Sequence, residues 1–455
     1  MARIRSSTNA LGRLLSLSDR PIYVLDEQRK YLFLNAACGR WLQIDEESLL
    51  GEQANYHSSP APDSPSVPFA NLLCPPPESF AGEDCTLHLE LRREDSTISR
   101  RAVQVFSFHD AESQVTGVIG IVSPNEVQRR AISSPTRSEA ADLHALLMST
   151  RQHFGSQLLL PSLIGESSGV QRAQLQLTAA SAVQVSTTII GPAGSGREAL
   201  ARRLHQQQGK GQTGPLVPLS CELLDAELLQ STIRELNLRS MQYDQEFAGT
   251  ILLLNVEQLS LEAQTELLGF LSLPSFSLHV IATAEQRLAE FAAADKFSSE
   301  LSDLLSAIEL IVPPLTKRRQ DIPLILQWLL EQTNAAGDRQ VSGFAVEALD
   351  VLVAYSWPGD IDEASELVEK LHGEAASAEI GLDDLPSYLR WAIEDRALPK
   401  RADDNIQLDD FLEEIEQELI RRALAVSRGN KAQAARSLGI SRPRMLRRIS
   451  HFGLD

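Results

Sequence analysis

Three short runs of apolar and β-branched residues in the middle of the chain predict strands of a buried sheet. They read TTII at 187–190, ILLL at 251–254 and LHVIA at 278–282, and apolar residues at helical spacing follow each of them. Strands that are apolar on both faces and alternate with helices are typical of a parallel sheet with crossover helices. After about residue 320 the apolar spacing is wholly helical. We therefore expect an α/β subdomain followed by an all-helical one.

The N-terminal third has a different pattern. RPIYVLDEQRKYLFLNAACG predicts two strands and the start of a helix, and a loop rich in proline and serine, SSPAPDSPSVP, follows. Apolar and polar residues then alternate in CTLHLELRR and AVQVFSFH, and a third strand-like run reads TGVIGIVS. Two strands, short helices and a three-strand meander resemble a PAS sensor domain, with an α+β fold over residues 18–124, after an N-terminal extension at residues 1–17.

The sensor region offers no defined cofactor site. Cys38, His57, His88 and His109 are candidates for haem or metal only by residue type, and isolated histidines in a sheet are more often structural. The four cysteines form no CxxC pair and no cluster with histidine, so neither zinc nor a disulfide framework is expected. We assign no metal and no cofactor to this region.

Residues 125–160 are expected to link the sensor to the α/β region. The stretch 125–137 is polar, and 138–154 has apolar residues at helical spacing. This resembles a signalling helix between a sensor and its effector domain. A plain solvated linker helix remains the alternative.

Charge is distributed unevenly along the chain. The 61 acidic and 42 basic residues give a formal net charge of −19, which would ordinarily argue against binding to a nucleic acid. Residues 421–454, however, contain nine arginines and lysines and no acid. No apolar run approaches the roughly 18 residues of a membrane span, and no secretory signal is evident at the N-terminus, so we expect a cytoplasmic protein without membrane contact.

The basic C-terminal segment predicts two short helices after a longer amphipathic helix at 408–427. A helix from Lys431 to Leu438 ends at Gly439, and Ser441 precedes a second helix with Pro443 in its first turn. We expect Ala434, Leu438, Ile440, Leu446 and Ile449 to pack the two helices together. The residues expected to face DNA are Lys431, Gln433, Ser441, Arg442, Arg444, Arg447 and Arg448.

NKAQAARSLGISRPRMLRRI resembles the Fis-type helix-turn-helix of bacterial enhancer-binding proteins, the activators that work with sigma-54 RNA polymerase. The resemblance implies an all-α domain at 408–455, after a linker at 399–407, that binds double-stranded DNA. It also implies a dimer through the preceding long helix, because one short recognition helix makes too few contacts for useful specificity.

The middle of the chain resembles the AAA+ domain of the same family. STTIIGPAGSGREALARRLH looks like its P-loop and following helix, FAGTILLLNVEQLSLEAQTELLGFL like its second nucleotide strand and helix, and LVAYSWPGDIDEASELVE like part of its lid. The resemblance implies an α/β P-loop subdomain at 161–315, an all-α lid at 316–398, and self-association into an oligomer larger than a dimer.

A P-loop brings backbone N–H groups, a lysine and a hydroxyl to the phosphates of ATP or ADP. The matching positions here are Gly191, Gly194, Ser195, Gly196, Arg197 and Glu198, so that arginine stands in the lysine position. Arginine is longer and planar and does not replace lysine without loss. Either the loop still binds a nucleotide, or the glycine turn is kept for folding alone.

The positions that the family uses for hydrolysis carry other residues. The two acids expected after the strand at 251–254 are Asn255 and Val256, and neither can hold magnesium well or accept a proton from water. The asparagine after the next strand is Ala284, the two arginines that reach a neighbouring subunit are Ser298 and Leu304, and the lid arginine is Asp362. We assign no catalytic residue and expect an AAA+ fold without ATP hydrolysis.

The family contacts sigma-54 through a GAFTGA loop, and no such sequence occurs at 221–250. This argues against sigma-54 remodelling. The leading hypothesis is a sequence-specific DNA-binding transcriptional regulator whose AAA+ module is a scaffold or nucleotide sensor. Two alternatives stay open: an ATP-hydrolysing activator of sigma-54 polymerase, and a non-catalytic protein that assembles with active relatives and modulates them.

Overall fold

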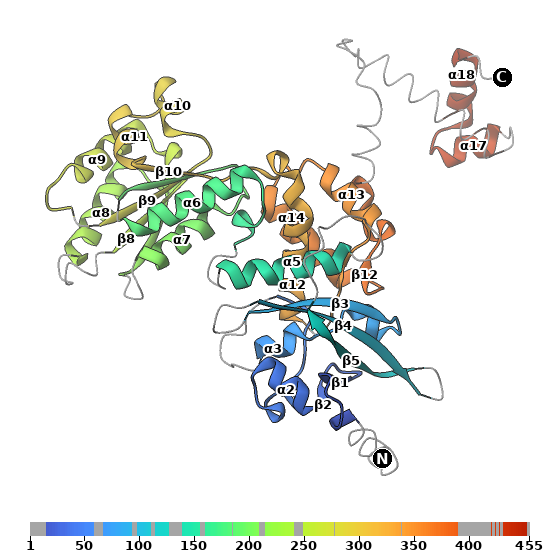
Figure 1. The fold of residues 1–455 in the computed structure, drawn as a ribbon. Coiled ribbons are helices and arrows are strands. Elements are labelled where there is room, and N and C mark those ends of the chain that lie inside the picture. The colour runs from blue at the N-terminus through green and yellow to red at the C-terminus, as the bar shows by residue number, and fades with distance from the viewer. Residues whose placement is uncertain are drawn as a thin grey trace. The chain divides into compact units, whose positions relative to one another are not determined.

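The computed structural model describes residues 15–58, 67–92, 98–110, 114–126, 139–154, 160–183, 185–208, 214–240, 249–276, 278–337, 339–389 and 431–452, together with Ile420, Leu424 and Ser427. Contacts divide the chain into two compact units, Met1–Ile393 and Glu394–Asp455. Figure 1 shows the elements of both units. No helix in the described part of the chain is long and apolar enough to cross a bilayer.

The N-terminal domain of the first unit is a five-stranded antiparallel sheet in the order β2-β1-β5-β4-β3. Its strands are β1 (Ile22–Asp26), β2 (Tyr31–Leu34), β3 (Cys85–Arg92), β4 (Ile98–His109) and β5 (Val115–Glu126). Between β2 and β3 lie α2 (Ala36–Leu42), the 3-10 turn η1 (Glu46–Leu49), α3 (Val67–Leu72) and α4 (Pro77–Phe80). This is the predicted PAS-like order of two strands, short helices and a meander.

The start of α2 shows how the sequence LNAA sets the local structure. The Asn35 side chain accepts hydrogen bonds from the backbone N–H of Cys38 (2.9 Å) and of Ile22 (3.0 Å), so it caps the helix and ties it to β1. Its amide group donates to the carbonyl of Arg20 at 2.7 Å. One buried asparagine thus fixes the entry into the helices of this domain.

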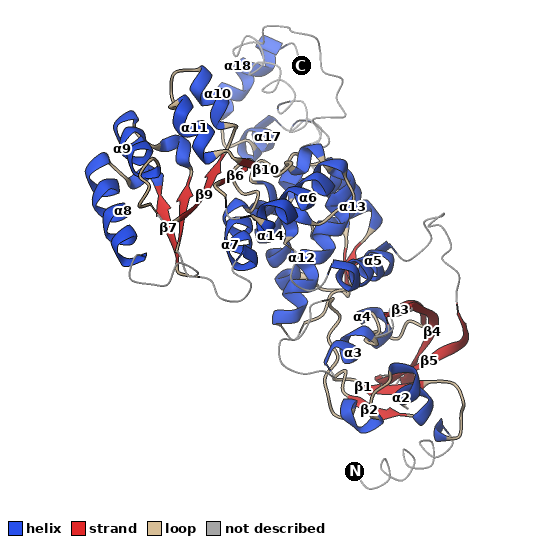
Figure 2. Ribbon diagram, turned by 60° about the vertical axis from the view of Figure 1, so that its left-hand side comes forward, coloured by secondary structure: helices blue, strands red, loops and turns tan. Residues whose placement is uncertain are grey.

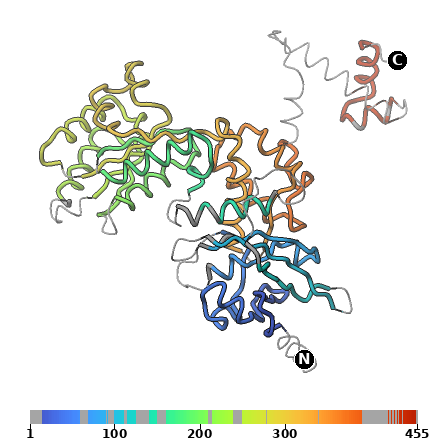
Figure 3. The backbone as a smooth tube through the Cα atoms, in the orientation of Figure 1, coloured from blue at the N-terminus to red at the C-terminus, as the bar shows by residue number. Residues whose placement is uncertain are grey.

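Helix α5 (Glu139–Phe154) follows the sensor sheet and contributes to two cores. Leu147 is fully buried among the lid residues, whereas the neighbouring Met148 packs against the core of the sensor. The helix contacts β3 on one side and α12 of the lid on another. The stretch with helical spacing is therefore a helix, and its side chains pack on the sensor and on the lid. Figure 3 shows the course of its backbone between these two parts of the first unit.

The α/β subdomain contains five parallel strands in the order β10-β6-β9-β8-β7. The strands are β6 (Thr187–Ile190), β7 (Leu216–Ser220), β8 (Thr250–Leu254), β9 (His279–Ala284) and β10 (Ile308–Ile311). Helices α6 (Ser168–Ala182), α7 (Arg197–Gln208), α8 (Ala226–Ser240), α9 (Leu261–Leu271), α10 (Leu288–Ala293) and α11 (Ser299–Leu305) cover the sheet. Figure 2 shows helices on both sides of the red strands.

Side chains of the central strands alternate between two cores. Ile251 and Leu253 of β8 face the core formed with α8, α9 and α11, whereas Leu252 faces the core formed with α6 and α7. This explains why the strand is apolar at every position, as the sequence pattern predicted for a sheet covered on both faces. The edge strands β7 and β10 were not predicted.

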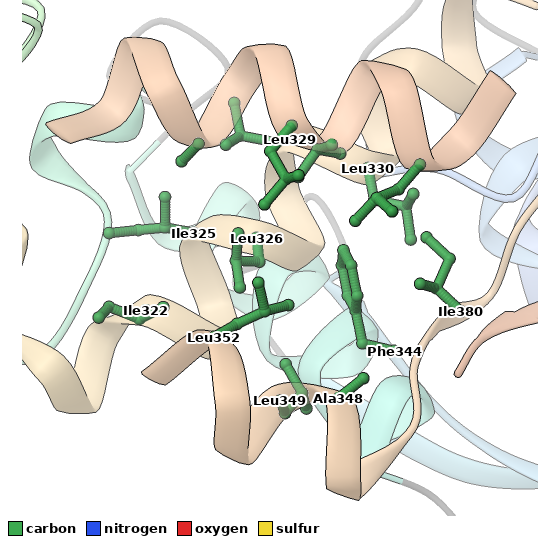
Figure 4. Close-up of a cluster of buried hydrophobic side chains, with 14 of the residues drawn as sticks. Ile322, Ile325, Leu326, Leu329, Leu330, Phe344, Ala348, Leu349, Leu352 and Ile380 are labelled. Atoms are coloured by element: carbon green, nitrogen blue, oxygen red, sulfur yellow. The ribbon is translucent and has the colours of Figure 1, made fainter. Parts of the chain in front are cut away.

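The lid is built from α12 (Ile322–Ala336), α13 (Val346–Ala354) and α14 (Asp360–Glu374). A two-residue parallel pair, β11 (Gly343–Phe344) with β12 (Glu379–Ile380), joins its ends. Leucines and isoleucines of α12 pack around Phe344 and Leu352 in its core (Figure 4). Short 3-10 turns complete the first unit: η2 (Pro161–Leu163), η3 (Cys221–Leu223), η5 (Val256–Gln258), η6 (Leu315–Lys317), η7 (Arg319–Asp321) and η8 (Leu382–Asp384).

The second unit contains the predicted helix-turn-helix, α17 (Lys431–Ser437) and α18 (Arg442–Phe452). Gly439 between them has a φ of 65°, the left-handed turn that the sequence predicted. The long helix predicted at 408–427, its dimer face, and Asn430 lie outside the described residues, apart from Ile420, Leu424 and Ser427.

One packing prediction in the second unit is wrong. Leu446 is 42% exposed, and Met445 is buried in its place, together with Ile449, Ala434 and Ala435. Met445 and Ile449 are four residues apart and share one face of α18, whereas Leu446 is turned about 100° away from that face.

Candidate functional site

The P-loop connects the end of β6 to the start of α7, as its sequence predicted. Gly194 has a φ of 74°, and a Cβ atom there would lie 2.0 Å from the carbonyl oxygen of Gly359 in the lid. The backbone N–H of Asp362, at the start of α14, donates to the carbonyl of Gly194 at 3.0 Å. The Ser195 hydroxyl donates to the carbonyl of Pro192 at 2.7 Å. The lid therefore contacts the P-loop directly, and glycine is required at that contact.

A cavity of about 460 Å³ lies at this contact. Of the predicted site residues, it is lined by Gly194, Gly196, Arg197, Glu198, Asn255 and Asp362. Ala199, Arg202, Leu254 and Thr283 also line it and were not predicted. Arg202 could have been found from its spacing, because it stands four residues after Glu198 on a helix and pairs with it at 2.6 Å.

Arg197 lies near two acids of the same subdomain. Its side chain is 9% exposed, and Nη2 lies 4.0 Å from Oε1 of Glu285, which directly follows β9. Nη1 is buried and has no hydrogen-bond partner in the described part of the chain. Burial lowers the pKa of the Arg197 guanidinium, and the nearby Glu257 and Glu285 act to raise it. The cation in the lysine position is thus buried and partly neutralised by acids of the same subdomain.

The segment after β8 carries no acid toward the cavity. Asn255 has a left-handed φ of 52°, and its backbone N–H donates to the Thr283 hydroxyl at 2.9 Å. Val256 is fully buried in the core. Glu257 accepts a hydrogen bond from the backbone N–H of Glu285 at 3.0 Å, and burial raises the pKa of its carboxyl. Glu257 therefore binds the backbone of the segment after β9 and does not line the cavity.

Three further predicted positions lie elsewhere in the subdomain. Ala284 is fully buried, and its carbonyl accepts from the backbone N–H of Gly191 at 3.1 Å. The Ser298 side chain caps α11 by accepting from the N–H of Leu301. Leu304 is 43% exposed on the same helix. None of these side chains carries a positive charge that could stabilise a phosphate.

The sensor residues considered for a cofactor are dispersed. Cys38 is fully buried, and burial raises the pKa of its thiol to about 12. The ring of His57 lies 3.4 Å from the Asn71 amide, His88 is on β3 and His109 ends β4. Among the described residues, no group of three histidines, cysteines or acids could hold a metal ion.

The helix-turn-helix presents a second site. Arg442, Arg444 and Arg447 are exposed on α18, and Arg444 and Arg447 are turned away from the face that carries the buried Met445 and Ile449. Gln433 and Ser441 are exposed, and Lys431 is half-buried. The guanidinium of Arg448 lies over the Phe452 ring, 5.7 Å from its centre. Helix α18 thus has basic residues on its exposed side and apolar residues on its buried side, as required of a helix that enters the major groove.

Three known families match consecutive parts of the chain. A sigma-54 interaction domain matches residues 164–315, an AAA+ ATPase lid domain matches 316–402, and a bacterial regulatory protein family, Fis, matches 411–452. The chain is thus multidomain, with a PAS-like α+β sensor, an α/β AAA+ P-loop core with an all-α lid, and a C-terminal all-α helix-turn-helix.

Known bacterial regulatory proteins are similar to part of the chain. The transcriptional regulatory protein ZraR of Klebsiella oxytoca is 30% identical over 308 residues, which cover 63% of this chain and 68% of ZraR. The regulatory protein AtoC of Escherichia coli K12 is 27% identical over 293 residues, 60% of this chain and 63% of AtoC. The crystal structure of NtrX from Brucella abortus in complex with ATP is similar over 68% of this chain and 74% of that one, with 24% identity and a TM-score of 0.44. The chain belongs to the bacterial enhancer-binding proteins, the sigma-54-dependent transcriptional regulators with a Fis-type DNA-binding domain.

Proposed function

We propose that this chain is a cytoplasmic, sequence-specific DNA-binding regulator whose AAA+ module does not hydrolyse ATP and acts as a scaffold or nucleotide sensor. The observation that carries the proposal is the lining of the cavity at the P-loop. Its charged side chains are two arginines, Arg197 and Arg202, and two acids, Glu198 and Asp362. A site that must hold a triphosphate needs an excess of positive charge, and this lining supplies none.

The acids are also in the wrong places for hydrolysis. Magnesium would need an acid at Asn255, and water would need a base at Val256, whose side chain is buried in the core. Glu257 is the one acid of that segment, and it is engaged with the backbone of Glu285. The chemistry of phosphoryl transfer depends on positioned charge, so this arrangement supports a module without turnover.

The lid contact supports the same conclusion. In the family resemblance, the lid position occupied here by Asp362 is an arginine that would approach the nucleotide. Here the N–H of Asp362 bonds to the P-loop carbonyl of Gly194, and its side chain adds negative charge to the cavity. The closed contact between lid and P-loop therefore needs no phosphate to bridge it, as a scaffold requires.

Contact with sigma-54 is the weaker part of the family resemblance for this chain. Helix α8 runs without interruption from Ala226 to Ser240, and no GAFTGA sequence occurs between β7 and β8. We therefore infer that the module contributes self-association, and that the C-terminal helices contribute a dimer and DNA binding. Remodelling of sigma-54 polymerase is not part of the proposed function.

ATP turnover by the purified full-length chain tests the proposal. With magnesium and ATP, phosphate release should stay at background, in the unchanged chain and in Arg197→Ala alike. The matched control is Arg172→Ala, which removes an exposed arginine of α6 outside the cavity. Turnover in the unchanged chain and in Arg172→Ala that disappears in Arg197→Ala would refute the proposal and support the ATP-driven activator instead.

A titration with a fluorescent ATP analogue separates the two forms of the proposal. Saturable binding that is lost in Arg197→Ala supports a nucleotide sensor. Absence of binding supports a scaffold.

A further inference from the structure

The sensor and the lid are joined by hydrogen bonds to buried lid side chains. The backbone N–H of Tyr56 donates to Oε1 of Gln340 at 2.8 Å, and the Tyr56 carbonyl accepts from the Asn334 amide at 2.9 Å. Two residues further on, the N–H of Ser58 donates to Oε2 of Glu331 at 2.8 Å. The sensor segment 56–58 is therefore bonded to α12 and to the residues that follow it, along the boundary visible between the blue and orange parts of Figure 3.

A cavity of about 280 Å³ opens along this boundary, and both domains form its walls. The sensor wall includes Arg29, Pro77 and Phe80, and the lid wall includes Arg339, Gln340 and Ala376. Tyr56 and Gln340 both line the cavity and are hydrogen-bonded to each other. The cavity therefore exists in this form only while the sensor is docked on the lid.

The charged side chains that line the cavity are two arginines, one from each wall. Nη1 of Arg339 donates to the carbonyls of His372 (3.3 Å) and Gly373 (2.9 Å) near the end of α14, which fixes the position of the guanidinium. Nε of Arg29 donates to the carbonyl of Ala54 at 3.2 Å. Backbone carbonyls thus orient both guanidiniums, and both side chains line the cavity.

The rest of the lining is mostly apolar, from proline, alanine and Phe80. Glu78, on the same short helix as Phe80, does not line the cavity, and it accepts a hydrogen bond from the hydroxyl of Ser342 in the lid. An apolar wall with two fixed arginines matches a small molecule that has an apolar body and one negative end. We propose that this cavity binds a small organic carboxylate.

Such a ligand would couple the sensor to the lid. It touches both walls, so it binds the docked arrangement and not the separated one. A ligand that binds only one of two states multiplies the population of that state relative to the other by one plus the ratio of the ligand concentration to its Kd. The carboxylate is thus a signal that holds the sensor on the lid, and it acts outside the core of the PAS-like sheet.

Thermal unfolding of the full-length chain with defined probes tests the site. The probes are acetate, butyrate, benzoate and succinate at equal ionic strength, with benzyl alcohol as a neutral match for benzoate and inorganic phosphate as an anion without an apolar body. We expect at least one carboxylate to raise the Tm and to slow amide hydrogen exchange in segment 56–58. Benzyl alcohol and phosphate should have neither effect.

Variants assign the effect to the cavity. Arg339→Gln and Arg29→Gln should each weaken the binding of the carboxylate that raises the Tm at least tenfold. Arg339→Lys, which keeps the charge, should weaken this binding less. Arg319→Gln, at an exposed arginine of the lid outside the cavity, should behave as the unchanged chain.

Four results would overturn the proposal. They are no response to any carboxylate, an equal response in both glutamine variants, an equal response to benzyl alcohol, and an equal response to phosphate. If Arg339→Gln does not fold, Arg29→Gln and Arg339→Lys give the same decision.

Discussion

Replacing Glu331 by glutamine should release the sensor from the lid. The Glu331 carboxylate is fully buried on α12 and accepts hydrogen bonds from three places: the N–H of Ser58 (2.8 Å), Nδ1 of His144 (2.8 Å) and the side chain of Gln327 (3.2 Å). Ser58 belongs to the sensor and His144 to α5, so one carboxylate connects three elements. Burial alone would raise its pKa, but the attraction of His144 and the hydrogen bonds from His144 and Ser58 outweigh burial and lower it.

The expected cost follows from the loss of one partner in a buried charge pair. Glutamine keeps the shape and one acceptor oxygen, but its NH2 group would face a donor, either the N–H of Ser58 or that of His144. Breaking a buried pair by removing one partner costs about 3–5 kcal/mol, and we take the lower end because one acceptor remains. At about 1.4 kcal/mol per factor of ten, the undocked population should rise on the order of 100-fold.

Amide hydrogen exchange measured by mass spectrometry is the suitable assay, because exchange of a protected amide reports local opening. In Glu331→Gln, peptides covering 56–58 and α5 should exchange on the order of 100-fold faster, while those of the α/β sheet should not change. Glu369→Gln, at an exposed position of α14, is the matched control. Unchanged protection of segment 56–58 in a folded Glu331→Gln chain would refute the reasoning.

The same variant has a defined pH dependence. A glutamate whose folded pKa is lowered contributes stability that is present above its ordinary value of 4.5 and is lost as the pH falls through the folded value. The difference in protection between the two chains should therefore shrink below about pH 4.5, because protonated Glu331 resembles glutamine.

Other changes have equally definite outcomes. Burial raises the pKa of Glu78, so the folded chain favours its protonated form; Glu78→Gln should raise the Tm near pH 7.5, and the gain should fade as the pH drops through the folded pKa of Glu78. The double change Arg444→Ala and Arg447→Ala should weaken DNA binding and reduce the slope of log affinity against log salt by about 2, whereas Lys317→Ala in the lid should leave the slope unchanged. Met445→Ala should lower the free energy of unfolding of the helix-turn-helix by about 2–5 kcal/mol, measured by denaturant unfolding of α17 and α18. Leu446→Ala should change it by no more than about 0.5 kcal/mol. Equal losses in the two variants would contradict the assigned faces.

The sequence predicted well those helices and strands whose secondary structure is determined by residues within the element and its flanking turns. The strand β6 was predicted at the observed residues, because β-branched residues flanked by turn signals leave few alternatives. The helix-turn-helix was equally clear, because Gly439, Ser441 and Pro443 act within one turn of their neighbours. The edge strand β7 was missed because its sequence, LVPLS, is short and interrupted by Pro218, which only an edge tolerates well.

Contacts between distant residues left no local signal. The partner of Arg197 is Glu285, which is ordinary in its own surroundings and becomes informative only when β9 places it beside the P-loop. Tyr56 and Gln340 are 284 positions apart, and neither belongs to a motif. The prediction that Leu446, and not Met445, is buried was wrong for a different reason. Two adjacent apolar residues in a short helix leave open which of them faces the core.

Helix α5 has a practical consequence for dividing this protein into fragments. Leu147 fills a place in the lid core, and Met148 packs on the sensor core. A truncation that begins at residue 161 would leave an apolar hollow on the lid, and one that ends at residue 124 would leave an exposed stripe on the sensor sheet. Both fragments should aggregate more readily than pieces that retain residues 139–154. Recombination between relatives faces the same constraint, since a transplanted sensor must arrive with a helix that fits both cores.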